Sequence, residues 1–154
     1  MHSSQNEQDS RHYAIASKIP MLEPSDSAES IAFVKEAFEI SEKFDTPIIV
    51  RLSTRVAHSQ SLVELCDRTE IANKPYEKNP GKYVMMPGNA KRRHPVVEAR
   101  TAALTAYAED AELNVVEPGK DNKMGIITSS TSYQYVKEVL GDTYPVMKLG
   151  LIWP

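Results

Sequence analysis

The sequence has 154 residues, a formal net charge of −3 and 41% apolar residues, enough to build a buried core. Its net negative charge argues against general nucleic-acid binding, which usually needs a basic surface. The single cysteine, Cys66, excludes an internal disulfide and cannot alone hold zinc or an iron–sulfur cluster. We expect Cys66 to be a half-buried structural residue and the compartment to be reducing, in keeping with a cytoplasmic protein. No apolar run approaches the roughly 20 residues that cross a bilayer, so we expect no membrane partner.

The first eleven residues carry the densest run of side-chain hydrogen-bonding groups in the chain, and almost none of them could fill a core. One interpretation is a frayed terminus. The other is a polar loop that lines a cofactor crevice just before a helix predicted over residues 7–18. The neutral hydrogen-bonding side chains of this loop are Ser3, Ser4, Gln5, Asn6 and Gln8.

A β-α-β unit is predicted over residues 19–52. A short apolar strand at 19–22 precedes a helix that begins near Asp26, because Asp26 and Glu29 have the spacing of a capping box. The helix runs to Phe44, and Pro47 prevents its continuation. A β-branched run over 48–52 is typical of a strand in a parallel sheet. The helix carries two apolar stripes, one of Ile31, Val34 and Phe38, the other of Phe33, Ala37, Ile40 and Phe44.

Thr54, Arg55 and His58 follow the second strand of this unit. Ligands of open α/β sheets lie in the crevice outside the carboxyl ends of the strands. The planar guanidinium of Arg55 suits a carboxylate, and a neutral imidazole at His58 can donate or accept a hydrogen bond. The alternative is a salt bridge at a domain boundary. Arg55 and His58 are therefore candidates for substrate binding or for a domain junction.

The second half of the chain predicts a connector and another β-α-β unit. Residues 60–88 read as a connector with a brief strand at 83–86, and a helix is predicted over 95–113 with Pro95 in its first turn. A loop at 114–122 precedes a strand at 124–128, a helix at 133–140 and a strand at 145–152. A two-stranded sheet with one helix leaves apolar faces uncovered. We expect the rest of that sheet to come from sequence after residue 154 or from a partner.

Two further segments could bind anions. Residues 129–132 (Ser-Ser-Thr-Ser) end a strand and open a helix, so their hydroxyls either cap the helix or hold a phosphate or carboxylate at its N-terminus. Lys91, Arg92, Arg93 and His94 put positive charge at the predicted helix start, where the helix dipole disfavours it. They form either a solvated linker or a docking patch for an acidic partner or phosphorylated ligand. No histidines stand at metal-ligand spacing, so no metal site is predicted.

Several motifs in register carry a family resemblance. Residues 1–11 (Met-His-Ser-Ser-Gln-Asn-Glu-Gln-Asp-Ser-Arg) and 19–26 resemble the thiamine-diphosphate-dependent 2-oxoacid:ferredoxin oxidoreductases, most closely the alpha subunits that act on indolepyruvate. Residues 54–59 (Thr-Arg-Val-Ala-His-Ser), 92–95 (Arg-Arg-His-Pro), 125–129 and 132–138 look like the same subunit in the same order. The resemblance covers essentially the whole chain.

The resemblance implies an α/β fold in three parts. Residues 1–65 would be the C-terminal part of a pyrimidine-binding parallel-sheet domain, 66–119 a helical connector, and 120–154 the start of a β-α-β domain similar to the transketolase C-terminal domain. The implied reaction is oxidative decarboxylation of an aryl pyruvate, with coenzyme A as acyl acceptor and ferredoxin as electron acceptor. The implied cofactors are thiamine diphosphate, magnesium and iron–sulfur clusters, and the implied partners are the rest of the alpha subunit and a beta subunit.

The sequence departs from the family pattern in what it lacks. It contains neither the activating glutamate region, nor the diphosphate- and magnesium-binding domain, nor the cysteine-rich cluster region, so we expect this chain alone to bind none of the cofactors and to be inactive. The first hypothesis is therefore an internal enzyme fragment, with no catalytic residue assigned. The second is a non-catalytic interaction module that docks through the basic patch at 91–94 and through its open sheet edge.

Overall fold

The computed structural model describes residues 9–154 and is a mixed α/β fold, which confirms the predicted class. The first β-α-β unit is β1 (Met21–Leu22), α2 (Ser27–Phe44) and β2 (Ile49–Val50), with β1 and β2 parallel as predicted. Helix α1 (Arg11–Ser17) precedes this unit and α3 (Thr54–His58) follows it. Asp26 caps α2 by accepting a hydrogen bond from the Glu29 N–H over 2.9 Å, which is the predicted helix start.

Only one of the two apolar stripes of α2 faces the core. Phe33, Ala37 and Ile40 are buried, whereas Phe38 is 69% exposed. Ile31 and Val34 are also exposed. The stripe of Ile31, Val34 and Phe38 therefore stays exposed in the described part of the chain. The core is formed by Leu22, Phe33, Ala37, Ala111 and Leu151.

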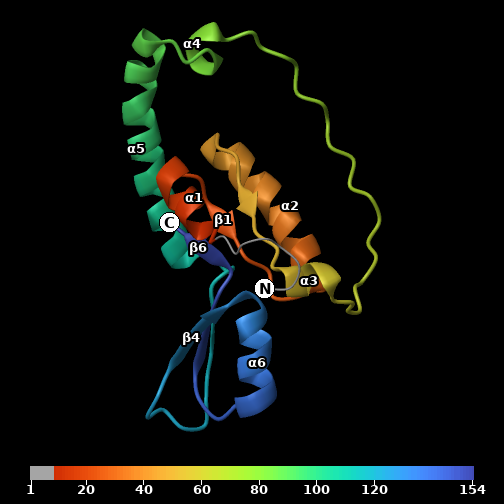
Figure 1. Cartoon of the computed structure of the whole chain (residues 1–154). Coiled ribbons are helices and arrows are strands. Elements are labelled where there is room, and N and C mark those ends of the chain that lie inside the picture. Colours follow the sequence, from red (N-terminus) through yellow and green to blue (C-terminus); the bar gives the residue numbers. More distant parts are fainter. Residues whose placement is uncertain (1–8) are drawn as a thin grey trace.

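The connector differs from its prediction in three respects. Residues 59–79, here called the connector arch, form no helix or strand and swing away from α2 before returning to α4 (Pro80–Tyr83), as Figure 1 shows. The strand predicted at 83–86 is wrong, because the residue at 83 ends α4 and those after it are irregular up to the start of α5. Cys66 lies on the arch and is exposed, so its predicted half-burial is wrong.

Helix α5 spans Pro87–Asp110 and begins well before the predicted start at Pro95. Pro87 takes the first-turn position, where a missing N–H costs nothing. Pro95 lies inside the helix on an exposed stretch, so it removes one backbone hydrogen bond without burying an unpaired carbonyl. None of the helices within residues 9–154 is long and apolar enough to cross a membrane.

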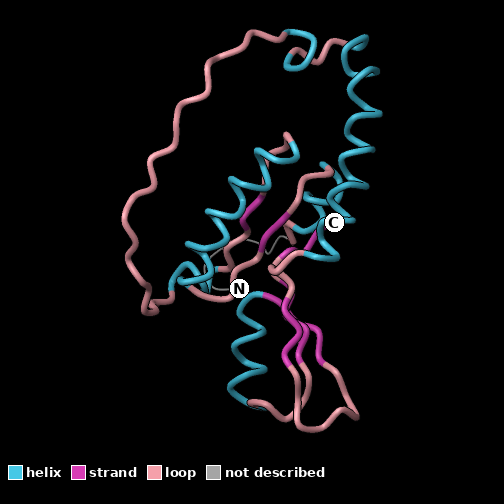
Figure 2. Tube along the Cα trace, turned by 180° about the vertical axis from the view of Figure 1, so that it is seen from behind, coloured by secondary structure: helices cyan, strands magenta, loops and turns pink. Residues whose placement is uncertain are grey.

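The second β-α-β unit is β4 (Ile126–Ser129), α6 (Ser130–Leu140) and β5 (Val146–Leu149), again with parallel strands as predicted. Strand β3 (Val115–Glu117) pairs antiparallel with β5, so the predicted loop over 114–122 is wrong in part. The resulting sheet has the order β3-β5-β4 and lies apart from the first sheet (Figure 2).

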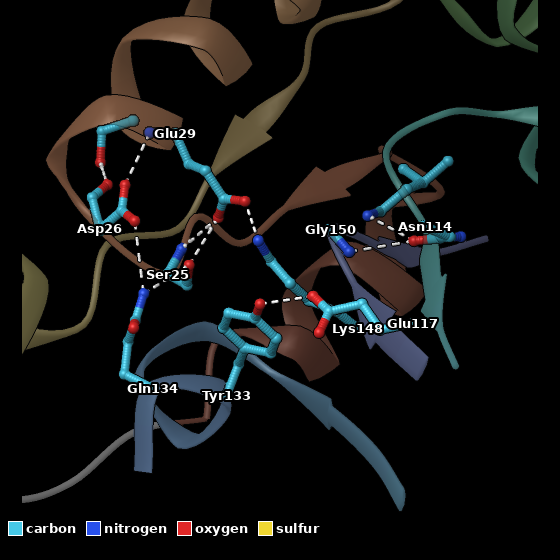
Figure 3. A network of polar contacts seen from close by, with 11 residues as sticks. Ser25, Asp26, Glu29, Asn114, Glu117, Tyr133, Gln134, Lys148 and Gly150 are labelled. Atoms are coloured by element: carbon cyan, nitrogen blue, oxygen red, sulfur yellow. Dashed lines mark hydrogen bonds and ion pairs between the residues drawn. The ribbon is translucent and has the colours of Figure 1, made fainter. Parts of the chain in front are cut away.

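The strand predicted over 145–152 is split at Gly150, and its two halves join different sheets. Residues after Gly150 form β6 (Leu151–Trp153), which pairs antiparallel with β1 and completes a sheet of order β2-β1-β6. A Cβ at Gly150 would overlap the Leu113 carbonyl oxygen and lie 2.7 Å from Phe33 Cζ. Oδ1 of Asn114 accepts from the N–H groups of both Gly150 and Leu151 over 3.0 Å (Figure 3). The sheet of the second unit, which was expected to be completed from outside residues 1–154, gains β3 from within the chain.

Candidate functional site

A buried carboxylate lies where strands of both sheets end. Glu23 follows β1 directly and is 0% exposed. It binds Arg11 through two contacts, Nε to Oε1 over 2.8 Å and Nη2 to Oε2 over 3.0 Å. Arg51, just after β2, donates from Nη1 over 3.1 Å, and Ser129, at the end of β4, donates from Oγ over 3.1 Å. One side chain therefore joins α1, the first sheet and the second sheet.

The same cluster fixes the start of α1. Nε of Arg51 donates to Oγ of Ser10, the residue before α1, over 3.1 Å. The hydrogen bond that the Glu23 carboxylate accepts raises the pKa of Arg11, the first residue of the helix. The chain that enters α1 is therefore anchored at the carboxyl ends of β1 and β2. The predicted crevice residues Ser3, Ser4, Gln5, Asn6 and Gln8 directly precede this anchor but lie outside the described residues.

A second polar network joins the β4-α6-β5 unit to the start of α2 (Figure 3). Oε2 of Glu29 accepts from N and Oγ of Ser25, both over 2.8 Å, while Oε1 pairs with the buried ammonium of Lys148. Burial lowers the pKa of Lys148, and the nearby Asp26 carboxylate partly offsets that shift. Nε2 of Gln134 donates to Oγ of Ser25 over 3.2 Å and to Oδ2 of Asp26 over 3.3 Å.

The lysine of this network also lies over an aromatic ring. Nζ of Lys148 is 4.5 Å from the ring centroid of Tyr133, whose hydroxyl donates to Glu117 over 2.5 Å. Partial burial and the Glu117 carboxylate raise the pKa of Tyr133 to about 12. Sequence reasoning missed both networks. The available signals were a lysine inside an apolar strand and a glutamate between Leu22 and Pro24.

Arg55 and His58, predicted from their place after a strand, both lie on α3 and line one pocket. This pocket has a volume of about 310 Å³. Ser53 caps α3 by accepting a hydrogen bond from the Val56 N–H over 3.3 Å, so α3 begins shortly after β2 ends. Arg55 also reaches a larger neighbouring pocket of about 450 Å³, where its guanidinium carbon lies 5.7 Å from the Tyr135 ring centroid. The other residues that line the larger pocket are Ser25, Asp26, Ser59, Gln60, Ser61, Thr131 and Gln134.

The predicted basic patch of Lys91, Arg92, Arg93 and His94 lies inside α5, not at its start, because the helix begins at Pro87. The argument from the helix dipole therefore does not apply at these positions. Three of the four are engaged within the described residues. Arg92 donates to Oδ1 of Asn89, Arg93 pairs with Asp45 over 3.6 Å, and His94 lies 3.4 Å from Glu98. Its role as an anion or partner patch stays a prediction.

The described residues do not by themselves form a metal or cluster site. Within residues 9–154, no three histidine, cysteine, aspartate or glutamate side chains gather closely enough to hold a metal ion. The exposed Cys66 stands alone on the connector arch. Residues 9–154 therefore contain neither a cluster of three such side chains nor a set of cysteines for an iron–sulfur cluster.

The chain matches curated relatives along its whole length. It is 39% identical over 159 aligned residues to the indolepyruvate oxidoreductase subunit IorA of Methanothermobacter thermautotrophicus, which covers 26% of that protein. It is 38% identical to the IorA subunit of Archaeoglobus fulgidus and 35% identical to that of Thermococcus kodakarensis, each covering 25% of the relative. A comparison with protein-family models finds no match.

The matched proteins are all named as subunits of an oxidoreductase. Along its whole length this chain is similar to the IorA subunits of indolepyruvate oxidoreductases. It spans about a quarter of the length of the curated relatives it matches.

Proposed function

We propose that this chain is a segment of the alpha subunit of an indolepyruvate:ferredoxin oxidoreductase, and that it shapes part of a cofactor crevice without completing one. The whole enzyme would convert aryl pyruvates oxidatively to acyl-CoA and reduce ferredoxin, together with the rest of the alpha subunit and a beta subunit. The observation that carries the proposal is the match to three IorA subunits along the whole chain.

Each of the three predicted parts of the chain would contribute a different piece of the enzyme's structure. Residues 1–65 would contribute the end of the pyrimidine-binding domain, 66–119 the connector, and 120–154 the start of the transketolase-like domain. Thiamine diphosphate, magnesium and the iron–sulfur clusters would be held mainly by sequence that this chain does not contain. The chemistry of decarboxylation and electron transfer belongs to those groups.

The chain's own contribution would be binding and orientation. The Glu23 cluster holds the entry to α1, so it would keep the polar segment before α1 at the carboxyl ends of the strands. Arg55 and His58 line a pocket on the same side of the first sheet's strands. A guanidinium there would bind the carboxylate of a 2-oxoacid in a planar, two-point contact. No residue of the described chain is assigned as catalytic acid or base.

A chimera tests the proposal. The matching quarter of the Methanothermobacter thermautotrophicus subunit is replaced by this chain, co-expressed with its partner subunit, and assayed for indolepyruvate-dependent ferredoxin reduction. We expect activity in the chimera, none in the isolated chain, and no heat of thiamine diphosphate binding to the isolated chain. Turnover by the isolated chain, or a chimera that assembles with cofactors yet is inactive on every aryl pyruvate, would contradict the proposal.

Arg55→Ala in the active chimera tests the substrate role. Loss of a charge-assisted contact to the oxoacid carboxylate should raise KM by about tenfold. The matched control is Arg68→Ala on the connector arch, whose side chain is 84% exposed. A KM unchanged by Arg55→Ala would assign this residue to a domain junction instead.

A further inference from the structure

We infer that the face of the β3-β5-β4 sheet that points away from α6, here called the open sheet face, is the docking surface for one helix from the remaining part of the alpha subunit. The inference rests on the proposed function, because it takes this chain to be a segment of that subunit. It concerns a surface and no reacting group, so it can be tested apart from turnover.

The strand contacts with α6 identify the side chains of the open sheet face. Figure 1 shows α6 beside the strands of this sheet. The Tyr133 hydroxyl of α6 donates to Glu117 of β3, and Lys148 of β5 lies over the Tyr133 ring, so both strand residues face the helix. Successive side chains of a strand alternate between the two faces of a sheet. The neighbouring residues Val116 and Met147 therefore point away from α6.

Three apolar side chains form a row across the open sheet face. Val116 is the strand partner of Met147, and Met147 is the strand partner of Ile127, so the row crosses all three strands. Val116 is 67% exposed and Ile127 is 70% exposed. Single exposed apolar side chains are common, but the face of a sheet that meets water usually carries polar residues at such positions. An apolar row in register therefore indicates a face that another element covers in the assembled protein.

The first β-α-β unit bounds the open sheet face at one end. Ser129 lies two residues beyond Ile127 in β4, on the same face, and its hydroxyl donates to Glu23 over 3.1 Å. Ser129 therefore does not cap α6, one of the two roles predicted for the hydroxyls of residues 129–132, and no side chain in the described range takes its place. The exposed strip around the row begins where this contact with the first unit ends.

The width of the row fits one helix. Neighbouring strands lie about 4.8 Å apart, so a row across three strands is about 10 Å wide, which is close to the diameter of a helix with its side chains. Parallel strands such as β4 and β5 usually have helices on both faces of their sheet, whereas α6 covers one face here. The partner should therefore be an amphipathic helix whose apolar stripe lies on Val116, Met147 and Ile127.

The comparisons favour the rest of the same subunit as the source of this helix. The chain covers 26% of the Methanothermobacter thermautotrophicus relative and 25% of the Archaeoglobus fulgidus relative, so most of each subunit lies outside the matched segment. Helices that cover an α/β sheet usually come from the same chain as its strands, because the connections between them are short. A second copy of this chain and the beta subunit are the alternative occupants.

Cysteine labelling of the isolated chain and of the chimera tests the inference. Ile127→Cys and its matched control Val139→Cys are made in a Cys66→Ser background, and Val139 is a 78% exposed residue of α6. In the isolated chain, a maleimide should label both positions at similar rates. In the chimera, with or without the partner subunit, labelling at position 127 should become about tenfold slower, because the reagent reaches a covered side chain only when the helix detaches. Labelling at position 139 should stay fast.

Four results would overturn the inference. Equal labelling rates at position 127 in the isolated chain and the chimera would show that no helix covers the face. Protection that extends to position 139 would indicate general shielding of the unit, and protection that requires the partner subunit would identify that subunit as the occupant. A dimer of the isolated chain that Ile127→Asp converts to a monomer, while Val139→Asp does not, would identify a second copy as the occupant.

The inference and the proposed function fail separately in this experiment. An active chimera with fast labelling at position 127 would refute the docking helix and leave the oxidoreductase role standing. An inactive chimera that is protected at position 127 and labelled at position 139 would refute that role and leave the docking surface standing. Because Ile127 and Val139 are both exposed, neither cysteine substitution should disturb the fold of the chain.

Discussion

Arg51 donates a hydrogen bond from Nη1 to the fully buried Glu23 carboxylate over 3.1 Å, across the carboxyl ends of two parallel strands. Arg11 contacts both oxygens of the same carboxylate from α1. The buried carboxylate of Glu23 is thus the shared counter-charge of two guanidinium groups. Both guanidinium groups are themselves only partly exposed. Removing the carboxylate would leave Arg51 without a carboxylate partner and Arg11 with only the more exposed Asp9, which lies 3.6 Å away.

Glu23→Gln should therefore lower the free energy of unfolding by about 3 kcal/mol, as expected when one partner of a buried ion pair is removed. Urea denaturation followed by circular dichroism measures the change. Glu70→Gln is the matched control, because the Glu70–Arg68 pair is 80% and 84% exposed and such pairs contribute little. Equal midpoints for Glu23→Gln and the native chain would show that the cluster does not stabilise the fold.

Gly150→Ala should destabilise the chain through steric overlap at the junction of the two sheets. The added methyl group would meet the Leu113 carbonyl oxygen and the Phe33 ring, and neither is the free end of a flexible side chain. We expect a loss of about 2 kcal/mol, the usual size of an overpacking effect. Gly125→Ala is the control, because nothing lies within 4 Å of its added Cβ. Thermal unfolding compares the two variants, and equal melting temperatures would contradict this view of the junction.

The local parts of the fold were predictable from the sequence. The Asp26 cap, the stop before Pro47 and the β-branched run at 48–52 give the first β-α-β unit, because each depends on residues close together in the chain. Arg55 and His58 lie on the helix that follows β2 and line one pocket, while their role in substrate binding or at a domain junction stays a prediction.

The long-range parts were not predictable. Glu23 pairs with residues 28 and 106 positions away, and its place between Leu22 and Pro24 does not identify those partners. The split at Gly150 depends on Leu113 and Phe33, which are distant in sequence. The stripe of α2 that contains Phe33 was as apolar as the stripe that contains Phe38, so burial depended on which side met the sheet.

Stability should fall at acidic pH partly through Glu117. Its hydrogen bonds from Lys137 over 2.7 Å and from Tyr133 lower the pKa of its carboxyl below the ordinary value of 4.5. The folded state therefore binds this proton less readily than the unfolded state. The resulting stabilisation is complete above pH 4.5 and is lost as the pH falls through the lower, folded-state pKa.

In Glu117→Gln, the melting temperature should fall less steeply with decreasing pH in the acidic range than it does in the native chain. The control is Glu109→Gln, an exposed glutamate on α5. If the two variants give the same profile as the native chain, the Glu117 contacts do not contribute to acid sensitivity.

The connector arch should be the first segment that a protease cuts. It has no helix or strand, and the Arg68 and Lys74 side chains are 84% and 76% exposed. Limited trypsin digestion should cleave after Arg68 and after the exposed Lys78 before it cleaves within α2 or α6, whereas Lys74 is protected because Pro75 follows it. The two flanking fragments should stay together because β6 pairs with β1. Mass spectrometry and gel filtration report both results. Initial cleavage at Lys35 in α2 would contradict the exposed, irregular structure of the arch. As a second measure of its exposure, Cys66 on the arch should react with a thiol reagent without denaturant.

Ser130→Gly should stabilise the protein by removing backbone strain at the start of α6. Ser130 has a φ of 49°, in the left-handed region where a side chain is disfavoured and glycine is not. Glycine would remove both that strain and the unpartnered buried hydroxyl, so we expect a gain of about 1 kcal/mol in the free energy of unfolding. Ser132→Gly, further along the same helix and exposed, should instead lose roughly 1 kcal/mol. Urea denaturation of both variants should give changes in the free energy of unfolding that have opposite signs. A Ser130→Gly chain that is less stable than the native one would show that the serine side chain is held by contacts stronger than its backbone strain.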